Sequence, residues 1–160
     1  MKLRHLLLPL LLAGGPAAAA AGSDKQPVDY VDLFIGTSNS RWMLGPYAQA
    51  PFGMVQLGPD NQGDVWMGGY EYSIHNVSGF SHLHAWTIGG LMIMPTTADL
   101  AIGNPSTDSP YRGANAGYHS RILKESETAS PGYYSVYLYD HAVRAELTAT
   151  TRCGVHRYTF

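Results

Sequence analysis

The last third of the chain alternates between apolar and polar residues with a period of two, which restricts it to strands. Within residues 143–149, apolar side chains occupy every second position and Arg144, Glu146 and Thr148 lie between them. Residues 155–160 alternate in the same way, and 133–139 form a run of aromatic and branched side chains. Turn signals at Asp140-His141 and Arg152-Cys153-Gly154 separate the three runs. This pattern predicts an antiparallel meander.

The remainder of the chain also favours strands joined by loops. The 160 residues include 18 Gly, 10 Pro and 11 Tyr, a composition that suits short strands and many turns. Short apolar runs at 52–57 and 91–94 predict two further strands, while 58–90 and 103–119 are rich in loop residues. Sustained helical periodicity is absent after the N-terminal segment. We therefore expect an all-β fold, an antiparallel β-sandwich of one domain.

The N-terminal residues 1–21 resemble a targeting segment. Lys2 and Arg4 precede a leucine-rich run, and small residues follow up to Ala21. A basic start, a short apolar stretch and a small-residue end predict a secretory signal peptide cleaved after Ala21. The alternative is an N-terminal anchor helix, but the apolar run is short for a membrane span. The mature domain would cover 22–160, would have no membrane contact, and would be secreted or periplasmic.

Charge and cysteine content exclude several classes of protein. The formal net charge is −2, so a strongly basic nucleic-acid-binding protein is not expected. Cys153 is the single cysteine, which rules out an intrachain disulfide and a cysteine-rich metal cluster. The nucleophile-elbow, phosphate-loop, zinc-protease and dinucleotide motifs do not occur in the sequence.

Aromatic and polar residues gather in the glycine-rich central region. Sugars present apolar ring faces to Trp and hydroxyls to His, Asp and Arg, so this mixture predicts a sugar-binding site. The candidate substrate-binding residues are Arg41, Asp60, Trp66, His82, His84 and Trp86. The alternative for each Trp is packing in the core.

His82 and His84 have the spacing that places two imidazoles on one face of a strand. Such a pair can bind zinc, but zinc sites use three or four protein ligands, and no metal site is predicted in this chain. Hydrogen-bonding histidines in a polar pocket and buried structural histidines are the other two interpretations. Asp60, Asp64 and Glu71 could supply a carboxylate pair for glycoside hydrolysis. We prefer the interpretation that Asp60 caps a turn and Asp64 is solvated.

Several segments resemble, in order, the start of glycoside hydrolase family 92, the calcium-dependent exo-α-mannosidases. The similar segments are Val31-Asp32-Leu33-Phe34-Ile35-Gly36-Thr37, residues 51–60 (PFGMVQLGPD), Gly69-Tyr70-Glu71-Tyr72, residues 79–84 (GFSHLH), Met94-Pro95-Thr96, residues 127–134 (ETASPGYY) and Glu146-Leu147-Thr148-Ala149-Thr150. The resemblance runs from about residue 29 to 160. Residues 85–90 and 40–43 depart from the usual family pattern, at positions where substrate contacts are expected.

The resemblance implies a galactose-mutarotase-like β-sandwich that precedes an (α/α)6 helical domain. It implies inverting, calcium-dependent hydrolysis of terminal α-mannosides of glycans. Calcium and the catalytic carboxylates would belong to the helical domain, so this chain would hold no catalytic residue and would be inactive alone. Its partners would be mannose-containing glycans and its own missing helical domain. Trp66 and the His82–His84 segment are the foremost candidates for contributing to the sugar site.

Two functions of different class follow. Residue 160 ends an alternating strand without a capping turn, so we expect the domain to be incomplete at its C-terminal end. The first function is the N-terminal domain of an exported α-mannosidase. The alternative is a free-standing carbohydrate-binding or structural β-sandwich without activity.

Overall fold

The computed structural model describes residues 25–38, 44–61, 69–84, 88–97 and 118–160. The predicted signal peptide and the candidate residues Arg41, Trp66 and Trp86 lie outside these ranges. In the described part, the helical elements are short 3-10 turns, among them η1 (Pro27–Tyr30) and η4 (Lys124–Ser126). None of the described helices has the length and apolar character that crossing a membrane requires. The fold is all-β, as the sequence predicts.

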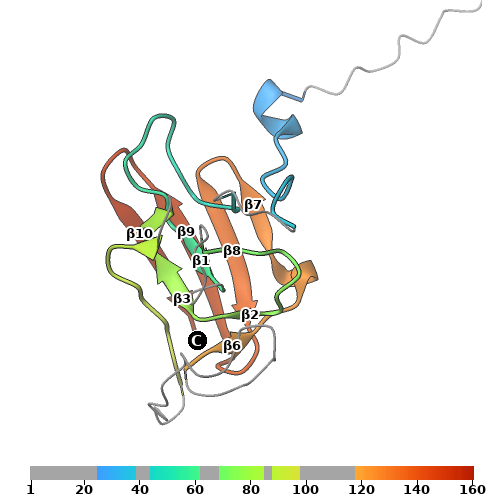
Figure 1. Ribbon diagram of the computed structural model, residues 1–160, viewed down its shortest axis with the longest axis vertical. Helices are drawn as coiled ribbons and strands as arrows, with labels where there is room; N and C mark the ends of the chain where they lie inside the picture. The colour runs from blue at the N-terminus through green and yellow to red at the C-terminus, as the bar shows by residue number, and fades with distance from the viewer. Residues whose placement is uncertain (1–24, 39–43, 62–68, 85–87, 98–117) are drawn as a thin grey trace, which may run out of the picture.

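One layer is a four-stranded antiparallel sheet with the order β10-β9-β8-β7 (Figure 1). Its strands are β7 (Thr128–Ser130), β8 (Tyr133–Leu138), β9 (Val143–Ala149) and β10 (Gly154–Thr159). The three predicted C-terminal strands are confirmed to within about one residue at their ends. Val136 pairs with Ala145, and Leu147 pairs with both Tyr134 and His156, so the alternation of all three strands is in phase. One face of the sheet therefore turns apolar side chains inward.

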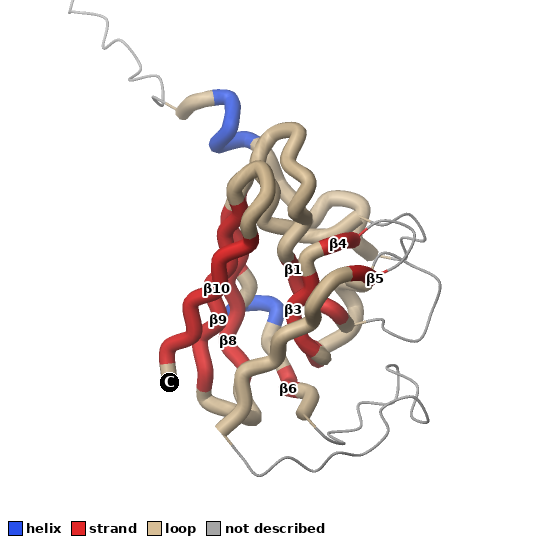
Figure 2. Tube along the Cα trace, turned by 90° about the vertical axis from the view of Figure 1, so that its left-hand side faces the viewer, coloured by secondary structure: helices blue, strands red, loops and turns tan. Residues whose placement is uncertain are grey.

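The second layer consists of short antiparallel pairs that face this sheet (Figure 2). β1 (Gly58–Asp60) pairs with β3 (Gly79–Ser81), β2 (Asn76–Val77) pairs with β6 (Ser120–Arg121), and β4 (Leu83–His84) pairs with β5 (Ile88–Gly89). Isolated bridges join Ala48 to Leu57 and Phe80 to Ile93. These pairs place β1, β3 and β4 side by side in space and bring Asp60, Ser81 and His84 together.

Two predicted strands are wrong in extent. Residues 52–56 form a turn and an irregular segment, and only Leu57 makes a bridge before β1 begins. Phe52 adopts a positive φ of 56° and is fully exposed, which a paired strand residue does not do. The run 91–94 contributes only the bridge at Ile93. In both places the apolar run is bordered by Pro, which cannot donate to a strand ladder.

The core lies between the two layers. Val136, Leu138, Val143 and Ala145 from the four-stranded sheet are fully buried, and Leu57, Val77 and Phe80 cover them from the second layer. These side chains form one contiguous apolar cluster. The sheet thus provides a rigid base for the polar groups at the end of β1 and in β4.

Candidate functional site

Three of the six predicted site residues lie in the described structure. Asp60 ends β1, His84 ends β4, and His82 occupies the bend between β3 and β4. The structure brings Asp60 and His84 together and places His82 elsewhere. None of these positions shows whether the residue binds a substrate, so their role in binding stays a prediction.

Asp60 and His84 form a buried, hydrogen-bonded pair. The His84 Nε2 atom lies 2.8 Å from Asp60 Oδ1, and the side chains are 0% and 1% exposed. Ser81 Oγ donates to the same carboxylate oxygen at 3.0 Å and lies 3.2 Å from His84 Nε2. The expectation that Asp60 caps a turn is wrong, because its carboxylate bonds across to β3 and β4. The pair is buried because β1, β3 and β4 converge at this point.

The hydrogen bonds of His84 fix where its protons are. Its Nδ1 lies 2.6 Å from the backbone oxygen of Gln56, which can only accept, so Nδ1 carries a hydrogen. A second proton lies between Nε2 and the Asp60 carboxylate. If Nε2 carries it, the pair is an imidazolium with a carboxylate; if Asp60 carries it, the pair is a neutral ring with a carboxylic acid. The Gln56 side chain also accepts from the backbone N–H of His84 at 3.3 Å. The ring is held from both ends and cannot turn without breaking one of these bonds.

The aromatic ring of Tyr47 covers His84. The two ring centroids are 4.0 Å apart with an interplanar angle of 17°, a stacked arrangement. Burial, and after it the charge of Asp60, raises the pKa of the Tyr47 phenol well above its ordinary value. Tyr47 is therefore held as the neutral phenol, and its ring covers one face of the His84 imidazole.

One oxygen of the buried pair has no partner. Among the described residues, Asp60 Oδ2 is buried and accepts no hydrogen bond. A buried carboxylate oxygen without a donor is costly, and such atoms concentrate where a structure has a further role. Asp60 lies two positions before the segment 62–68, and His84 lies immediately before 85–87.

Asn61 connects the two described residue ranges on either side of the segment 62–68. Its side-chain amide donates to the backbone oxygen of Glu71 at 3.0 Å, and its Oδ1 accepts from the Glu71 backbone N–H at 2.8 Å. The Asn61 backbone N–H donates to the Gly69 oxygen at 2.7 Å. These three bonds hold Asn61 against Gly69 and Glu71, next to Asp60. Glu71 is also buried, and its Oε1 accepts from Ser73.

His82 belongs to a different cluster from His84. Because His82 lies at a bend and not within a strand, the prediction that both rings share one strand face is wrong. His82 Nδ1 lies 2.9 Å from the backbone oxygen of Leu91, and its Nε2 lies 3.3 Å from His156 Nε2. Burial, together with the neighbouring His82, lowers the pKa of His156.

Sequence reasoning missed a second buried polar cluster around Glu127. Tyr134 and Tyr70 donate to Glu127 Oε1 at 2.6 Å and 3.0 Å, and Lys124 Nζ lies 2.9 Å from Oε2. Burial lowers the pKa of Lys124, although Glu127 opposes this effect. The cluster joins 70–71 to η4 and β8 and is accounted for by structural support alone. The ETASPGYY motif contains two of its members, Glu127 and Tyr134, so the motif itself was the available signal.

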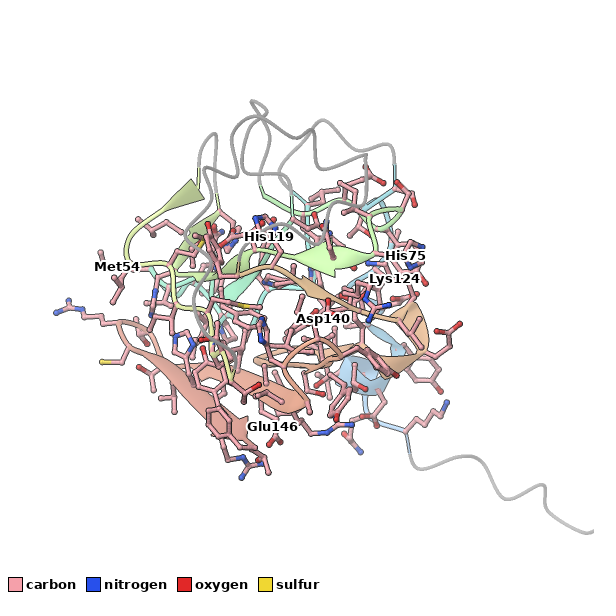
Figure 3. All side chains as sticks on the ribbon, turned by 90° about the horizontal axis from the view of Figure 1, so that it is seen from below. Met54, His75, His119, Lys124, Asp140 and Glu146 are labelled. Carbon is pink, nitrogen blue, oxygen red and sulfur yellow. The ribbon has the colours of Figure 1, made fainter. Side chains whose placement is uncertain are left out.

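Two ion pairs, Arg157–Glu146 and Arg121–Asp140, have exposed arginine side chains. Glu146 lies on the outer face of the sheet, opposite the side on which His119 is found (Figure 3). Arg157 and Tyr133 bind Glu146 and lower the pKa of its carboxyl to about 2. Arg121 likewise lowers the pKa of Asp140. These pairs lie at the surface and form no pocket with Asp60.

Tyr47 also contributes to the wall of an open pocket of about 800 Å³. Leu33, Phe52, Pro131 and Thr148 are other members of this wall. Among the described residues that line the pocket, none has a charged side chain.

Calcium, which the resemblance implies, does not fit the residues described. Calcium takes six to eight oxygen ligands, several of them carboxylates. In residues 25–160 apart from the gaps given above, no group of three or more His, Cys, Asp and Glu side chains could hold a metal ion.

The described residues thus form an antiparallel β-sandwich with a buried carboxylate–imidazole pair at the ends of β1 and β4. The family model of the glycosyl hydrolase family 92 N-terminal domain matches residues 30–160. The chain belongs to glycosyl hydrolase family 92, and the matched part is the N-terminal domain of that family.

Solved structures and a curated relative agree with this assignment. The family GH92 alpha-mannosidase BT3965 from Bacteroides thetaiotaomicron is 34% identical, with a TM-score of 0.71 over 83% of this chain and 18% of that one. The family GH92 inverting mannosidase BT2199 from the same organism is 27% identical, with a TM-score of 0.62 over 85% of this chain and 18% of that one. A secreted glycosidase of Arthroderma benhamiae is 28% identical over 97% of this chain and 20% of its own length. The chain thus spans about a fifth of the length of these proteins.

Proposed function

We propose that this chain is the N-terminal domain of an exported α-mannosidase that removes terminal α-linked mannose from glycans. The observation that carries the proposal is the family match over 30–160 together with structural similarity to a mannosidase at 34% identity. BT3965 has also been solved in complex with mannoimidazole. In this proposal the reaction is inverting and calcium-dependent, and calcium and the catalytic carboxylates come from a helical domain beyond this chain.

The domain's own part in the reaction is to hold substrate-binding loops. Asp60 and Asn61 precede the segment that contains Trp66, and His84 precedes the segment that contains Trp86; all three residues are held by hydrogen bonds. A loop whose ends are fixed by buried hydrogen bonds loses less conformational entropy when it binds a sugar. Trp66 would stack on a sugar ring, and Asp60 would act as a positioning residue through His84. Arg41 and Trp86 complete the proposed set.

Inactivity of the isolated chain is part of the proposal. Inverting glycosidases need an acid and a base whose carboxyl groups flank the scissile bond. Asp60 is buried and its Oδ1 is bound by His84 and Ser81, so we do not assign it the role of activating a water molecule. The chain alone should release no mannose from an α-mannoside, with or without calcium. Release that Asp60→Asn abolishes would contradict this part of the proposal.

The role of the segment that contains Trp66 is tested in the full-length enzyme, which includes the catalytic domain. We expect Trp66→Ala to lower kcat/KM by roughly 5- to 150-fold, the loss of about 1–3 kcal/mol of stacking in the transition state. Melting temperature would change little. A large fall in melting temperature with unchanged kcat/KM would show that Trp66 packs in the core. It would favour a structural sandwich over a substrate-binding domain.

Export is proposed for the same protein. The relative from Arthroderma benhamiae is described as secreted, and residues 1–21 have the pattern of a signal peptide. A final location in the periplasm or outside the cell is consistent with glycan substrates. N-terminal sequencing of exported protein should begin at Gly22.

A further inference from the structure

His82 and His156 bring two imidazole nitrogens together across the sandwich. Their Nε2 atoms are 3.3 Å apart, and the ring centroids are 5.1 Å apart with an interplanar angle of 50°. His82 lies in the bend after β3, in the second layer, whereas His156 lies on β10 at the edge of the four-stranded sheet. The pair therefore connects two elements that are 74 residues apart in sequence.

Each ring is held through its other nitrogen. His82 Nδ1 donates to the backbone oxygen of Leu91 at 2.9 Å, which leaves its neutral ring with a lone pair on Nε2. His156 Nδ1 lies 2.8 Å from the hydroxyl of Tyr158. Histidines that bind metals usually have this arrangement, in which a hydrogen bond at one nitrogen orients the other toward the ion.

The separation of the two Nε2 atoms matches neighbouring ligands of a tetrahedral zinc ion. Zinc–nitrogen bonds of about 2.0–2.1 Å in a tetrahedron place adjacent nitrogens about 3.3–3.4 Å apart. Both rings are half-buried, so water can reach the remaining coordination positions. Calcium prefers oxygen ligands and binds imidazole nitrogens poorly. Zinc, copper and nickel ions bind imidazole nitrogens well.

We propose that His82 and His156 form a binding site for a divalent transition-metal ion of the zinc type, with water as the other ligands. Without metal, His156 Nε2–H donates to His82 Nε2. On binding, the His156 ring proton moves to Nδ1, where the Tyr158 hydroxyl oxygen accepts it, and both Nε2 lone pairs face the ion. No third side-chain ligand of the His, Cys, Asp or Glu type joins the pair among the described residues, so the site is weaker than a structural zinc site.

The ion would fasten the two layers at one end of the sandwich. His82 begins the segment that continues into β4 and β5, and Leu91, which holds its ring, follows that hairpin. Gly154 on β10 provides the space for the ring, because a Cβ at Gly154 would lie 2.7 Å from His82 Cδ2. The site is independent of mannosidase activity and can be tested without a substrate.

The experiment is a titration of the full chain with Zn²⁺ alone, followed by calorimetry and thermal unfolding. We expect Zn²⁺ to raise the melting temperature, and His82→Gln and His156→Gln each to weaken binding by at least about tenfold. His75→Gln is the matched control because His75 is exposed and lies outside the pair; it should bind as the unchanged protein does. Tyr158→Phe should weaken binding less than loss of either ligand.

A second readout does not depend on the variants folding. In the unchanged chain, Zn²⁺ should shift the imidazole NMR signals of His82 and His156 and leave those of His75 in place. Equal shifts at all histidines, or binding unaffected by both ligand substitutions, would mean adventitious binding only and would overturn the proposal. Absence of any Zn²⁺-dependent change at a molar excess of metal would overturn it as well.

Discussion

The ring of Tyr47 lies almost parallel to that of His84, with 4.0 Å between the centroids. Two glycines, Gly58 of β1 and Gly45, leave room for the Tyr47 ring. A Cβ on Gly58 would lie 2.4 Å from Cδ1 of Tyr47, and a Cβ on Gly45 would lie 2.3 Å from its Cζ, closer than real carbon atoms approach. The absence of a side chain at both positions therefore allows Tyr47 to cover His84.

Gly58→Ala should displace Tyr47 from His84 and lower the free energy of unfolding by about 1–3 kcal/mol, the usual cost of overpacking. The measurement is urea unfolding together with the NMR shifts of the His84 ring protons, which sense the stacked tyrosine. Gly132→Ala is the control, since Gly132 has a positive φ of 82° and its Cβ would lie no closer than 4.0 Å to the nearest atom. That change should cost stability through the backbone but leave the His84 signals unchanged. Unchanged His84 shifts in Gly58→Ala would contradict the prediction.

Asp60→Ala should destabilise the fold by about 3–5 kcal/mol, because it leaves a buried imidazole without its anion. His84→Ala should cost a similar amount, and the double variant clearly less than the sum of the two. Chemical unfolding of the three variants measures this coupling. Arg121→Ala is a suitable control, since its pair with Asp140 is exposed to solvent and should contribute little to stability. Strict additivity of the two core substitutions would show that the pair does not interact.

Glu127→Ala should also cost about 3–5 kcal/mol, because Lys124, Tyr70 and Tyr134 all lose their shared acceptor. The exposed Glu125 lies two residues earlier, and Glu125→Ala should change stability by less than about 0.5 kcal/mol. Thermal unfolding of the two variants side by side provides the comparison. Equal melting temperatures would indicate that the buried cluster is not a major contributor to stability.

Acidification should destabilise the protein partly through His119. Burial lowers the pKa of His119 from its ordinary value of 6.5, so the unfolded chain binds a proton more readily than the folded one. The contribution of the neutral ring to stability is present above pH of about 6.5 and is lost as the pH falls toward the lowered folded-state pKa. His119→Gln should therefore reduce the slope of unfolding free energy against pH in this range. Identical slopes for the unchanged protein and His119→Gln would refute the assignment to His119.

The sequence by itself determined the sheet of the C-terminal third. The alternation in 143–149 and 155–160 can bury one face only as antiparallel strands, and the structure has β9 and β10 there. The turn residues between them are local signals as well. The order of family segments was likewise sufficient to indicate the family that the match over 30–160 shows.

The tertiary structure decided which polar residues meet. His82 and His84 are two positions apart, yet one pairs with His156 and the other with Asp60. Their partners lie 74 and 24 residues away, and only the crossing of β1, β3, β4 and β10 brings them within bonding distance. The apolar run at 52–57 predicted a strand because hydrophobic periodicity and composition do not report backbone turns. Phe52 lies in such a turn, and its positive φ depends on the residues around it. Local patterns specify strands, whereas buried pairs depend on packing between segments distant in sequence.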